Sequence, residues 1–469
     1  MLFNSLQFVF FFIVVTLAYF SLPHRGRIWL LLLASCYFYA VFKPIYILIL
    51  FVTIVVDYFA GILIADATGK KRKWLLVLSL ITNISFLAYF KYYNFLNTNL
   101  AVILSKLDTP TPFPFLEFAL PIGLSFHTFQ AMSYTIEVYR GNQKAEKDFV
   151  IYSLYVMFYP QLVAGPIERP QNMLWQFHTY FKFSFDNLKE GLMRIAWGLF
   201  KKVVIADRLS MVVDYCYDNP QDHNGLTLLI GTIFFTFQIY CDFSGYSDIA
   251  LGTARVMGFK LMENFDTPYF STSISEFWRR WHISLSGWFR DYLYIPMGGN
   301  RVGEARMYFN RFFVFMMSGL WHGAAWTFVI WGALHGLYLI SAQIRDKYFK
   351  LRTNPLPGFL SAPFNLLFTF ILVMLAWVFF RAKGLTNAKI IMQKLFSFGS
   401  YGDTIQAPFN NTEMLFCWLL IALLLLKEKF IKVIDVTNTT RFYVVFASLL
   451  VVCYFFGVFD SSQFIYFQF

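Results

Sequence analysis

The chain has 469 residues, of which 58% are hydrophobic and only 14% are charged. This composition excludes an ordinary soluble globular protein, and repeated apolar runs of roughly 18 residues or more predict an all-α, polytopic membrane protein. The formal net charge of +12 comes from basic residues in short loops between these runs, which is typical of cytoplasmic loops and not of a nucleic-acid-binding surface.

Apolar runs in the first half of the chain predict a series of membrane-spanning helices. They cover residues 6–22, 28–42, 45–65, 74–90, 120–139 and 149–167. The basic turns at residues 24–27 and 69–73 are expected to face the cytoplasm, which places the N-terminus outside. Because the first run lacks a basic flank and a small-residue cleavage site, we predict a retained span and not a signal peptide.

The second half alternates between polar segments and further spans. Residues 188–213 mix apolar with basic side chains, which predicts an amphipathic helix that lies in the membrane interface or re-enters it. Further apolar runs cover residues 226–257, 311–344, 364–380, 414–426 and 442–458. Positive charge before the last run places the tail, residues 459–469, outside. We predict one membrane domain over residues 1–469, with core motifs at 120–344 and C-terminal helices and the tail at 359–469.

His322 is the first candidate for chemistry because it lies in SGLWHGAAWTF, inside an apolar run, residues 311–344, without Asp, Glu, Lys or Pro. An ionisable ring in such a run is costly, and imidazole suits proton transfer near neutral pH. Gly319 and Gly323 flank His322 at a spacing that allows another helix to pack closely. Trp321 and Trp326 are large enough to form a pocket wall. The run is too long for one straight crossing, so we expect a tilt or break near the glycines. The alternative is a core histidine bonded to a carbonyl.

A second polar set lies in YCDFSGYSDIA and contains Asp242, Ser244 and Asp248. Their spacing puts the two carboxylates on nearly opposite helical faces, so Gly245 is expected to open the helix between them. In one interpretation these side chains orient His322 or line a tunnel. In the other they cap broken helices or pair with arginines, for which the candidates are Arg279, Arg280 and Arg290.

The remaining histidines have weaker sequence signals. His282 lies in WRRWHIS beside Trp278, Arg279 and Arg280, which can contact an anionic head group or coenzyme phosphates, or serve as interfacial anchors. His335 is turned about 140° from His322 on a continuous helix, so we interpret it as a packing or interface residue, and His127 as structural. The five cysteines are scattered without a CxxC pair, so no metal site is expected.

Taken in order, these motifs resemble the membrane-bound O-acyltransferase family, and specifically its alginate O-acetyltransferase (AlgI-like) branch. The matching segments are PIGLSFHTFQAMSYTIEVYRG (121–141), PQLVAGPIERP (160–170), YCDFSGYSDIA (240–250), EFWRRWHISLSGWFRDYLYIPMGGNR (276–301), SGLWHGAAWTFVIWGALHG (318–336), LAWVFFRA (375–382) and FIYFQF (464–469). Their joint occurrence over most of the chain is highly specific, whereas each one alone would be weak.

The resemblance implies a bundle of about 10–12 transmembrane helices, with re-entrant or interfacial helices, around a central tunnel. It places His322 at the family's essential histidine, as a general base or acyl-transfer partner, and His282 at a second polar position that is commonly Asn or Asp. It also implies acetyl-CoA as the acyl donor, the bacterial inner membrane as the location, and a periplasmic SGNH-hydrolase-like acetyltransferase as the partner. Membrane lipid and a polysaccharide acceptor complete the expected contacts.

The tail gives a further hypothesis. FIYFQF resembles the aromatic C-terminal motif of the small protein that accompanies the teichoic-acid D-alanylation acyltransferase, where a tyrosine is proposed as acyl carrier. By that resemblance Tyr466 accepts acetyl from the His322 site and passes it to the partner. The alternative is an aromatic anchor at the membrane boundary.

Two other classes of protein compete with the acyltransferase. A transporter or flippase also uses intramembrane Asp and His side chains, but it favours paired halves, and the two halves of this chain have no internal similarity. A scaffold that only recruits a periplasmic enzyme would leave His322 dispensable. The motifs favour the acyltransferase with an alginate-like exopolysaccharide, while cellulose, another exopolysaccharide and peptidoglycan stay open as acceptors.

Overall fold

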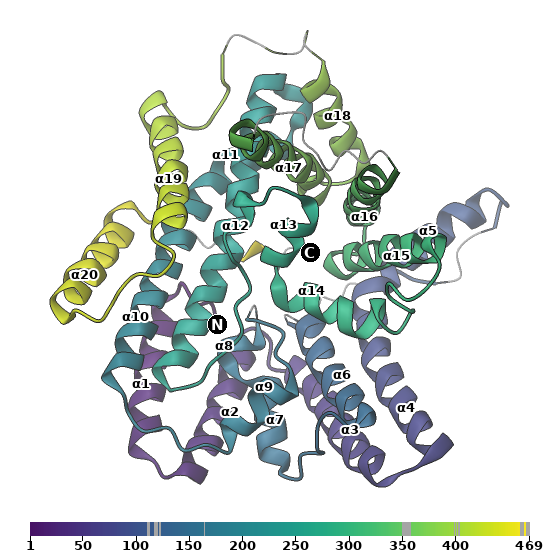
Figure 1. The fold of residues 1–469 in the computed structure, drawn as a ribbon, viewed down its shortest axis with the longest axis vertical. Coiled ribbons are helices and arrows are strands. Elements are labelled where there is room, and N and C mark those ends of the chain that lie inside the picture. Colours follow the sequence, from purple (N-terminus) through teal and green to yellow (C-terminus); the bar gives the residue numbers. More distant parts are fainter. Residues whose placement is uncertain are drawn as a thin grey trace. The chain divides into compact units, whose positions relative to one another are not determined.

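The described part of the chain is helical, with no strand, in a computed structural model (Figure 1). The structure describes residues 1–109, 113–116, 121, 123–163, 165–348, 358–397, 399, 401, 404–459 and 464–465. The chain divides into two compact units, one formed by Met1–Ile195 with Ser247–Met262, the other by Ala196–Tyr246 with Glu263–Phe469. The prediction of an all-α membrane protein is confirmed.

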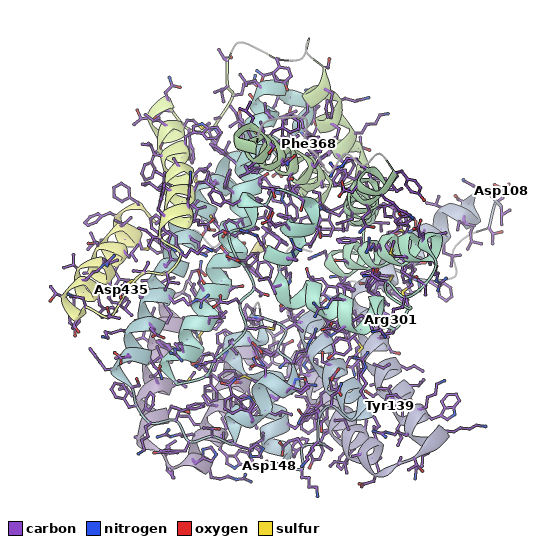
Figure 2. All side chains as sticks on the ribbon, in the orientation of Figure 1. Asp108, Tyr139, Asp148, Arg301, Phe368 and Asp435 are labelled. Carbon is purple, nitrogen blue, oxygen red and sulfur yellow. The ribbon has the colours of Figure 1, made fainter. Side chains whose placement is uncertain are left out.

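The first unit begins with apolar helices and continues through shorter ones. They are α1 (Leu6–Ser21), α2 (His24–Ala40), α3 (Tyr46–Asp66), α4 (Gly69–Leu87), the π-helical turn η1 (Ala88–Tyr92), α5 (Tyr93–Ser105), α6 (Leu124–Arg140), α7 (Phe149–Met157), α8 (Tyr159–Leu162) and α9 (Pro170–Phe177). Asp148, labelled in Figure 2, caps α7 by accepting hydrogen bonds from two backbone N–H groups of its first turn. Asp57 of α3 is buried and accepts hydrogen bonds from Ser79 and Asn83 of α4, so this carboxyl group is satisfied between the two helices.

Two helices pass from one unit to the other. Helix α10 (Phe185–Leu199) continues through a π-helical segment, η2 (Phe200–Ala206), into α11 (Asp207–Asp218). Helix α12 (Gly225–Val256) has its first part in the second unit and its last part in the first.

In its described residues, the rest of the second unit contains five short helical segments and six longer helices. The short ones are η3 (Pro220–Asp222), η4 (Pro268–Phe270), α13 (Ile274–Arg280) and α14 (Ile283–Phe289), which continues as the π-helical turn η5 (Arg290–Tyr294). The longer ones are α15 (Glu304–His322), α16 (Trp326–Tyr348), α17 (Gly358–Arg381), α18 (Leu385–Phe396), α19 (Asn411–Phe430) and α20 (Thr439–Phe456).

Six helices of the described chain are long and apolar enough to cross a membrane, by length and composition alone. They are Tyr46–Asp66, Gly69–Ser105, Gly225–Val256, Trp326–Tyr348, Leu360–Arg381 and Thr439–Phe456. Helix α1 is apolar but shorter. The resemblance implied about 10–12 spans, and some of the difference lies in runs that the fold interrupts: residues 149–167, for example, break at Phe158 between α7 and α8. Exposed apolar side chains such as Phe368, labelled in Figure 2, give α17 a surface suited to lipid.

Three local predictions can be compared with this structure. The expected break in residues 311–344 is confirmed, because α15 ends at His322 and α16 begins at Trp326. The expected opening of α12 at Gly245 is wrong, since the helix is continuous there. Residues 188–213 are helical but not simply amphipathic, because Lys189, Lys201 and Lys202 are buried.

Gly245 has a packing role instead of a hinge role. A Cβ atom at this position would lie 2.8 Å from the Gly198 carbonyl oxygen and 3.2 Å from the Lys202 nitrogen. The glycine therefore allows α12 to approach the end of α10 and the start of η2 closely, which a larger residue would prevent.

Candidate active site

His322 is the last residue of α15 and lies in the hairpin that α15 forms with α16 (Figure 1). Gly319 of α15 faces Gly332 of α16. A Cβ atom added at Gly319 would lie 3.4 Å from the Gly332 Cα and would overlap the Phe328 carbonyl group. The small residues near His322 thus allow the close helix approach that their spacing predicted. The hairpin fixes the His322 backbone against α16.

Aromatic rings enclose the imidazole of His322, a residue that is only 4% exposed. The ring centroids of Trp321, Trp331 and Phe380 lie 4.8, 5.1 and 5.3 Å from that of His322. All three rings stand steeply to the imidazole, with interplanar angles of 74°, 89° and 68°. This shell places the His322 ring in low-polarity surroundings, where a proton transfer is shielded from bulk water.

His282 occupies a strained backbone position directly before α14. Its φ is +42°, in the left-handed region that residues other than glycine rarely adopt, and the residue is fully buried. Asn264 fixes the turn, because the Ser284 hydroxyl donates to Asn264 Oδ1 at 2.6 Å. Backbone strain of this kind is found preferentially at functional sites.

The two histidines share one aromatic neighbour. The His282 ring centroid lies 6.2 Å from that of Trp321, whose own ring is next to His322. On another side His282 contacts Phe243 of α12, at 4.6 Å between centroids and 83° between planes. The structure therefore brings His282 close to Trp321 and His322, which lie in a separate segment of the sequence.

Trp278 and His335 are linked by a hydrogen bond. They belong to the same aromatic region as His322, because both contact Trp331. Trp278 Nε1 donates to His335 Nδ1 at 3.2 Å, and His335 is fully buried. Because Nδ1 accepts, the neutral ring carries its hydrogen on Nε2. Trp331 lies 5.1 Å from both His335 and His322, so His335 is one ring away from the candidate base despite its unfavourable spacing on a continuous helix.

Asp242 and Ser244 take part in a buried charged cluster with two lysines of η2. Lys202 Nζ lies 2.6 Å from Asp207 Oδ1 and 2.8 Å from Asp242 Oδ1, and these side chains are at most 4% exposed. Lys201 Nζ donates to Ser244 Oγ at 2.8 Å. The carboxylate of Asp242 is therefore neutralised by a lysine, and the suggested arginine partner is wrong.

Asp248 belongs to the first unit and not to the aromatic region. It pairs with Arg194 of α10 at 2.9 Å, both side chains being partly buried. Arg290, which was another possible partner, pairs with its neighbour Asp291. The interpretation of Asp248 as a paired structural carboxylate thus fits its contacts, although with a different arginine.

The other predicted site residues are placed more peripherally. Arg279 is exposed, and Arg280 pairs with Glu276 one helical turn away at 2.7 Å. Trp326 is 51% exposed at the start of α16, so most of its ring area is not part of an inner pocket wall. Tyr466 lies outside the described residues.

Four residues of the charged cluster and of the aromatic rings around His322 were not singled out from the sequence. Lys202 and Asp207 were included in a predicted amphipathic helix that lies in the membrane interface or re-enters it, although two adjacent lysines in an apolar stretch are a signal for internal pairing. Trp331 and Phe380 were part of matching segments but were not singled out for their rings. Within the described residues no group of three or more His, Cys, Asp or Glu side chains could hold a metal ion.

Known membrane acyltransferases are similar to this chain over much of its length. Residues 142–382 match the model of the membrane-bound O-acyltransferase family. The chain is 41% identical to a probable alginate O-acetylase AlgI of Pseudomonas aeruginosa, over 86% of this chain and 76% of that protein. It is 37% identical to a peptidoglycan O-acetyltransferase of Helicobacter pylori, over 84% of this chain and 79% of that protein. A teichoic acid D-alanyltransferase of Bacillus subtilis is 28% identical, over 49% of this chain and 60% of that protein.

Proposed function

The chain belongs to the membrane-bound O-acyltransferase family, and from this premise we propose that it moves acetyl groups from cytoplasmic acetyl-CoA across the bacterial inner membrane. As a family member it is a multi-pass membrane O-acyltransferase. Relatives named for O-acetylation of alginate and of peptidoglycan support an extracytoplasmic polysaccharide, alginate-like, as the final acceptor. The proposed topology keeps both termini outside.

The observation that carries this proposal is the environment of His322. The residue is buried, its ring is enclosed by Trp321, Trp331 and Phe380, and it ends a helix at a break between two close-packed helices. The carbonyl groups at a helix C-terminus carry partial negative charge, which stabilises an imidazolium ion formed there. A base in this place suits proton removal from a hydroxyl group beside a thioester that must be shielded from water.

In the proposed reaction the acceptor hydroxyl oxygen attacks the thioester carbonyl carbon of acetyl-CoA while His322 takes the hydroxyl proton. A C–O bond forms, the C–S bond breaks, and the imidazolium ion returns the proton to the departing thiolate. His282, with its strained backbone and its contact with Trp321, is proposed to help position the acceptor or the thioester. No metal is required by this chemistry.

We propose Tyr466 as the first acceptor hydroxyl and a periplasmic SGNH-hydrolase-like acetyltransferase as the protein that takes the acetyl group from it. An acetyl ester on a phenol is more reactive than one on a sugar, so the onward transfer is downhill. This assignment rests on the aromatic tail motif.

The test supplies isotope-labelled acetyl-CoA to the purified protein in a lipid bilayer and locates the label by peptide mass spectrometry. The His322→Ala variant is compared with His178→Ala, because His178 is an exposed histidine outside the region. We expect label on Tyr466 in the wild type and in the His178 variant, and none in the His322 variant.

Each other outcome separates the parts of the proposal. Equal labelling of the His322→Ala variant would refute the role of His322. Release of labelled acetyl to an added partner without label on Tyr466 would refute the carrier role alone. Movement of an intact solute without any acyl transfer would favour a transporter.

A further inference from the structure

Two residues of the C-terminal tail, Phe464 and Ile465, are buried inside the second unit. Phe464 is fully buried and Ile465 is 3% exposed. The backbone N–H of Ile465 donates to Asp242 Oδ2 at 2.7 Å, a contact that links the tail to the middle of α12 across 223 residues of sequence. An anchor that merely lies on the membrane surface would not need this internal contact.

The carboxylate that receives the tail is itself held in place. Lys202 lies between Asp207 and Asp242, with Nζ–O distances of 2.6 and 2.8 Å, in a position that is almost completely buried. Lys202 pairs with Asp242 Oδ1, and a buried carboxylate also needs N–H donors at its second oxygen, Oδ2. The Ile465 backbone N–H supplies one such donor.

Aromatic contacts connect the tail with the candidate active site. The Phe464 ring stacks on Tyr246, with 4.2 Å between centroids and 28° between planes, and lies 5.8 Å from Phe243. Phe243 in turn contacts His282 at 4.6 Å. The tail and His282 therefore pack against the same ring of α12.

A second set of contacts holds the chain where it leaves α20. The Val458 N–H donates to the Val203 carbonyl oxygen at 2.8 Å, and Arg208 donates to the Phe456 carbonyl oxygen at 2.9 Å. Val203 is in η2, the same segment that carries Lys202. Val458 is thus bonded to η2 directly. Ile465 is bonded to Asp242, which pairs with Lys202 of the same segment.

We propose that Asp242, held by Lys202, is a docking group for the backbone of the C-terminal tail, and that this contact positions Tyr466 for acyl transfer. Ile465 directly precedes Tyr466 in the sequence. Asp242 is a positioning residue here, since it acts through the tail and not on the acyl group. The docking contact stands by itself, whereas its consequence for transfer rests on the proposed function of Tyr466.

The test removes the backbone N–H donor at residue 465. Ile465→Pro has no backbone N–H, while the matched control Ile465→Ala keeps it and loses side-chain volume. A second variant, Asp242→Asn, keeps an acceptor oxygen but loses the charge paired with Lys202. Hydrogen exchange of the peptide that covers residues 459–469 reports docking in the full-length protein, and labelled acetyl-CoA reports transfer to Tyr466.

We expect the remaining tail amides of Ile465→Pro to exchange roughly ten times faster or more than those of Ile465→Ala, as for loss of a charge-assisted hydrogen bond. Label on Tyr466 is expected to fall in parallel, while acetyl-CoA binding is unchanged. Asp242→Asn is expected to be intermediate in both measurements.

The two readouts fail separately. Unchanged tail exchange in Ile465→Pro and Asp242→Asn would overturn docking. Faster exchange with undiminished label on Tyr466 would overturn the positioning role. If the wild type itself carries no label on Tyr466, the carrier proposal fails, and tail exchange still decides whether Asp242 docks the tail.

Discussion

Replacing Gly319 by alanine should damage catalysis without touching any reacting group. The added Cβ atom would overlap the Phe328 carbonyl oxygen and lie 3.0 Å from the Phe328 carbonyl carbon. Both are backbone atoms of α16, so no side-chain rotation can relieve the contact. Restoring normal van der Waals separation requires α15 and α16 to move apart by about 1 Å. His322 is three residues further along α15 and moves with it.

Two magnitudes follow from this displacement. Overpacking at a close helix contact costs about 1–3 kcal/mol of stability. A misplacement of about 1 Å at a catalytic group can lower the rate on the order of 100-fold. We therefore expect Gly319→Ala to fold with a modestly lower Tm and, at temperatures where it is still folded, to lose activity on the order of 100-fold. Gly332→Ala, which would overlap the Phe315 carbonyl oxygen from the opposite helix, should behave in the same way.

The assay measures transfer of labelled acetyl from acetyl-CoA at equal protein concentration, together with thermal unfolding in the same detergent. Gly303→Ala is the matched control, because Gly303 caps the start of the same helix and a Cβ there would meet no heavy atom within 4 Å. If Gly319→Ala keeps its rate within about threefold of the control, a difference of less than 1 kcal/mol in barrier, the close contact does not position His322 and the reasoning is wrong.

Three further substitutions test separate contacts. Trp278→Phe leaves the buried His335 Nδ1 without its donor and should cost about 1–3 kcal/mol of stability, whereas the same change at exposed Trp175 should cost little; equal Tm values would refute the role of this bond. Lys202→Met removes the ammonium group that pairs with the buried Asp207 and Asp242, and it should destabilise the protein by about 3–5 kcal/mol. The control Lys70→Met, at the surface, should change stability little, and a Lys202→Met variant as stable as the wild type would contradict this. Burial raises the pKa of Glu168 to about 7, from 4.5, against the lowering effect of its hydrogen bonds with Asn172 and the Met262 N–H. The folded protein then binds this proton more tightly than the unfolded chain, so stability should fall by up to about 3 kcal/mol as the pH rises from 4.5 to 7 and stay level above; Glu168→Gln should flatten that slope in unfolding measurements, and an unchanged slope would assign the proton elsewhere.

The helical class and the break beside His322 could be predicted because both depend on local sequence. The apolar runs define helices, and the length of residues 311–344 together with Gly323 indicates a break. The pairing of Lys202 with Asp207 could not be predicted in this way. Lys202 and Asp207 are five residues apart, which on an α-helix would turn them about 140° from each other. In the π-helical segment the Asp207 N–H bonds to the Lys202 carbonyl oxygen, and this wider turn brings their side chains together to pair.

The position of His282 beside Trp321 shows a second limit. The motif around His282 indicated a functional segment, but nothing local to WRRWHIS states which ring it will meet. That neighbour is decided by the turn at Asn264 and by the left-handed backbone at His282, neither of which has a simple sequence signature. Long-range packing of this kind is accessible from the sequence only through resemblance to a family whose motifs occur together.

The break at Gly323 is what makes an enclosed site possible. On a continuous helix His322 and Trp331 would lie on opposite faces, about 13–14 Å apart along the axis, since nine residues complete two and a half turns. In the structure their rings are 5.1 Å apart because the chain turns back between α15 and α16. Irregular backbone at membrane depth must be surrounded by protein, and under the proposed function the rings that enclose His322 supply part of that surrounding. The same turn therefore gives His322 the buried, ring-lined surroundings that the proposed reaction requires.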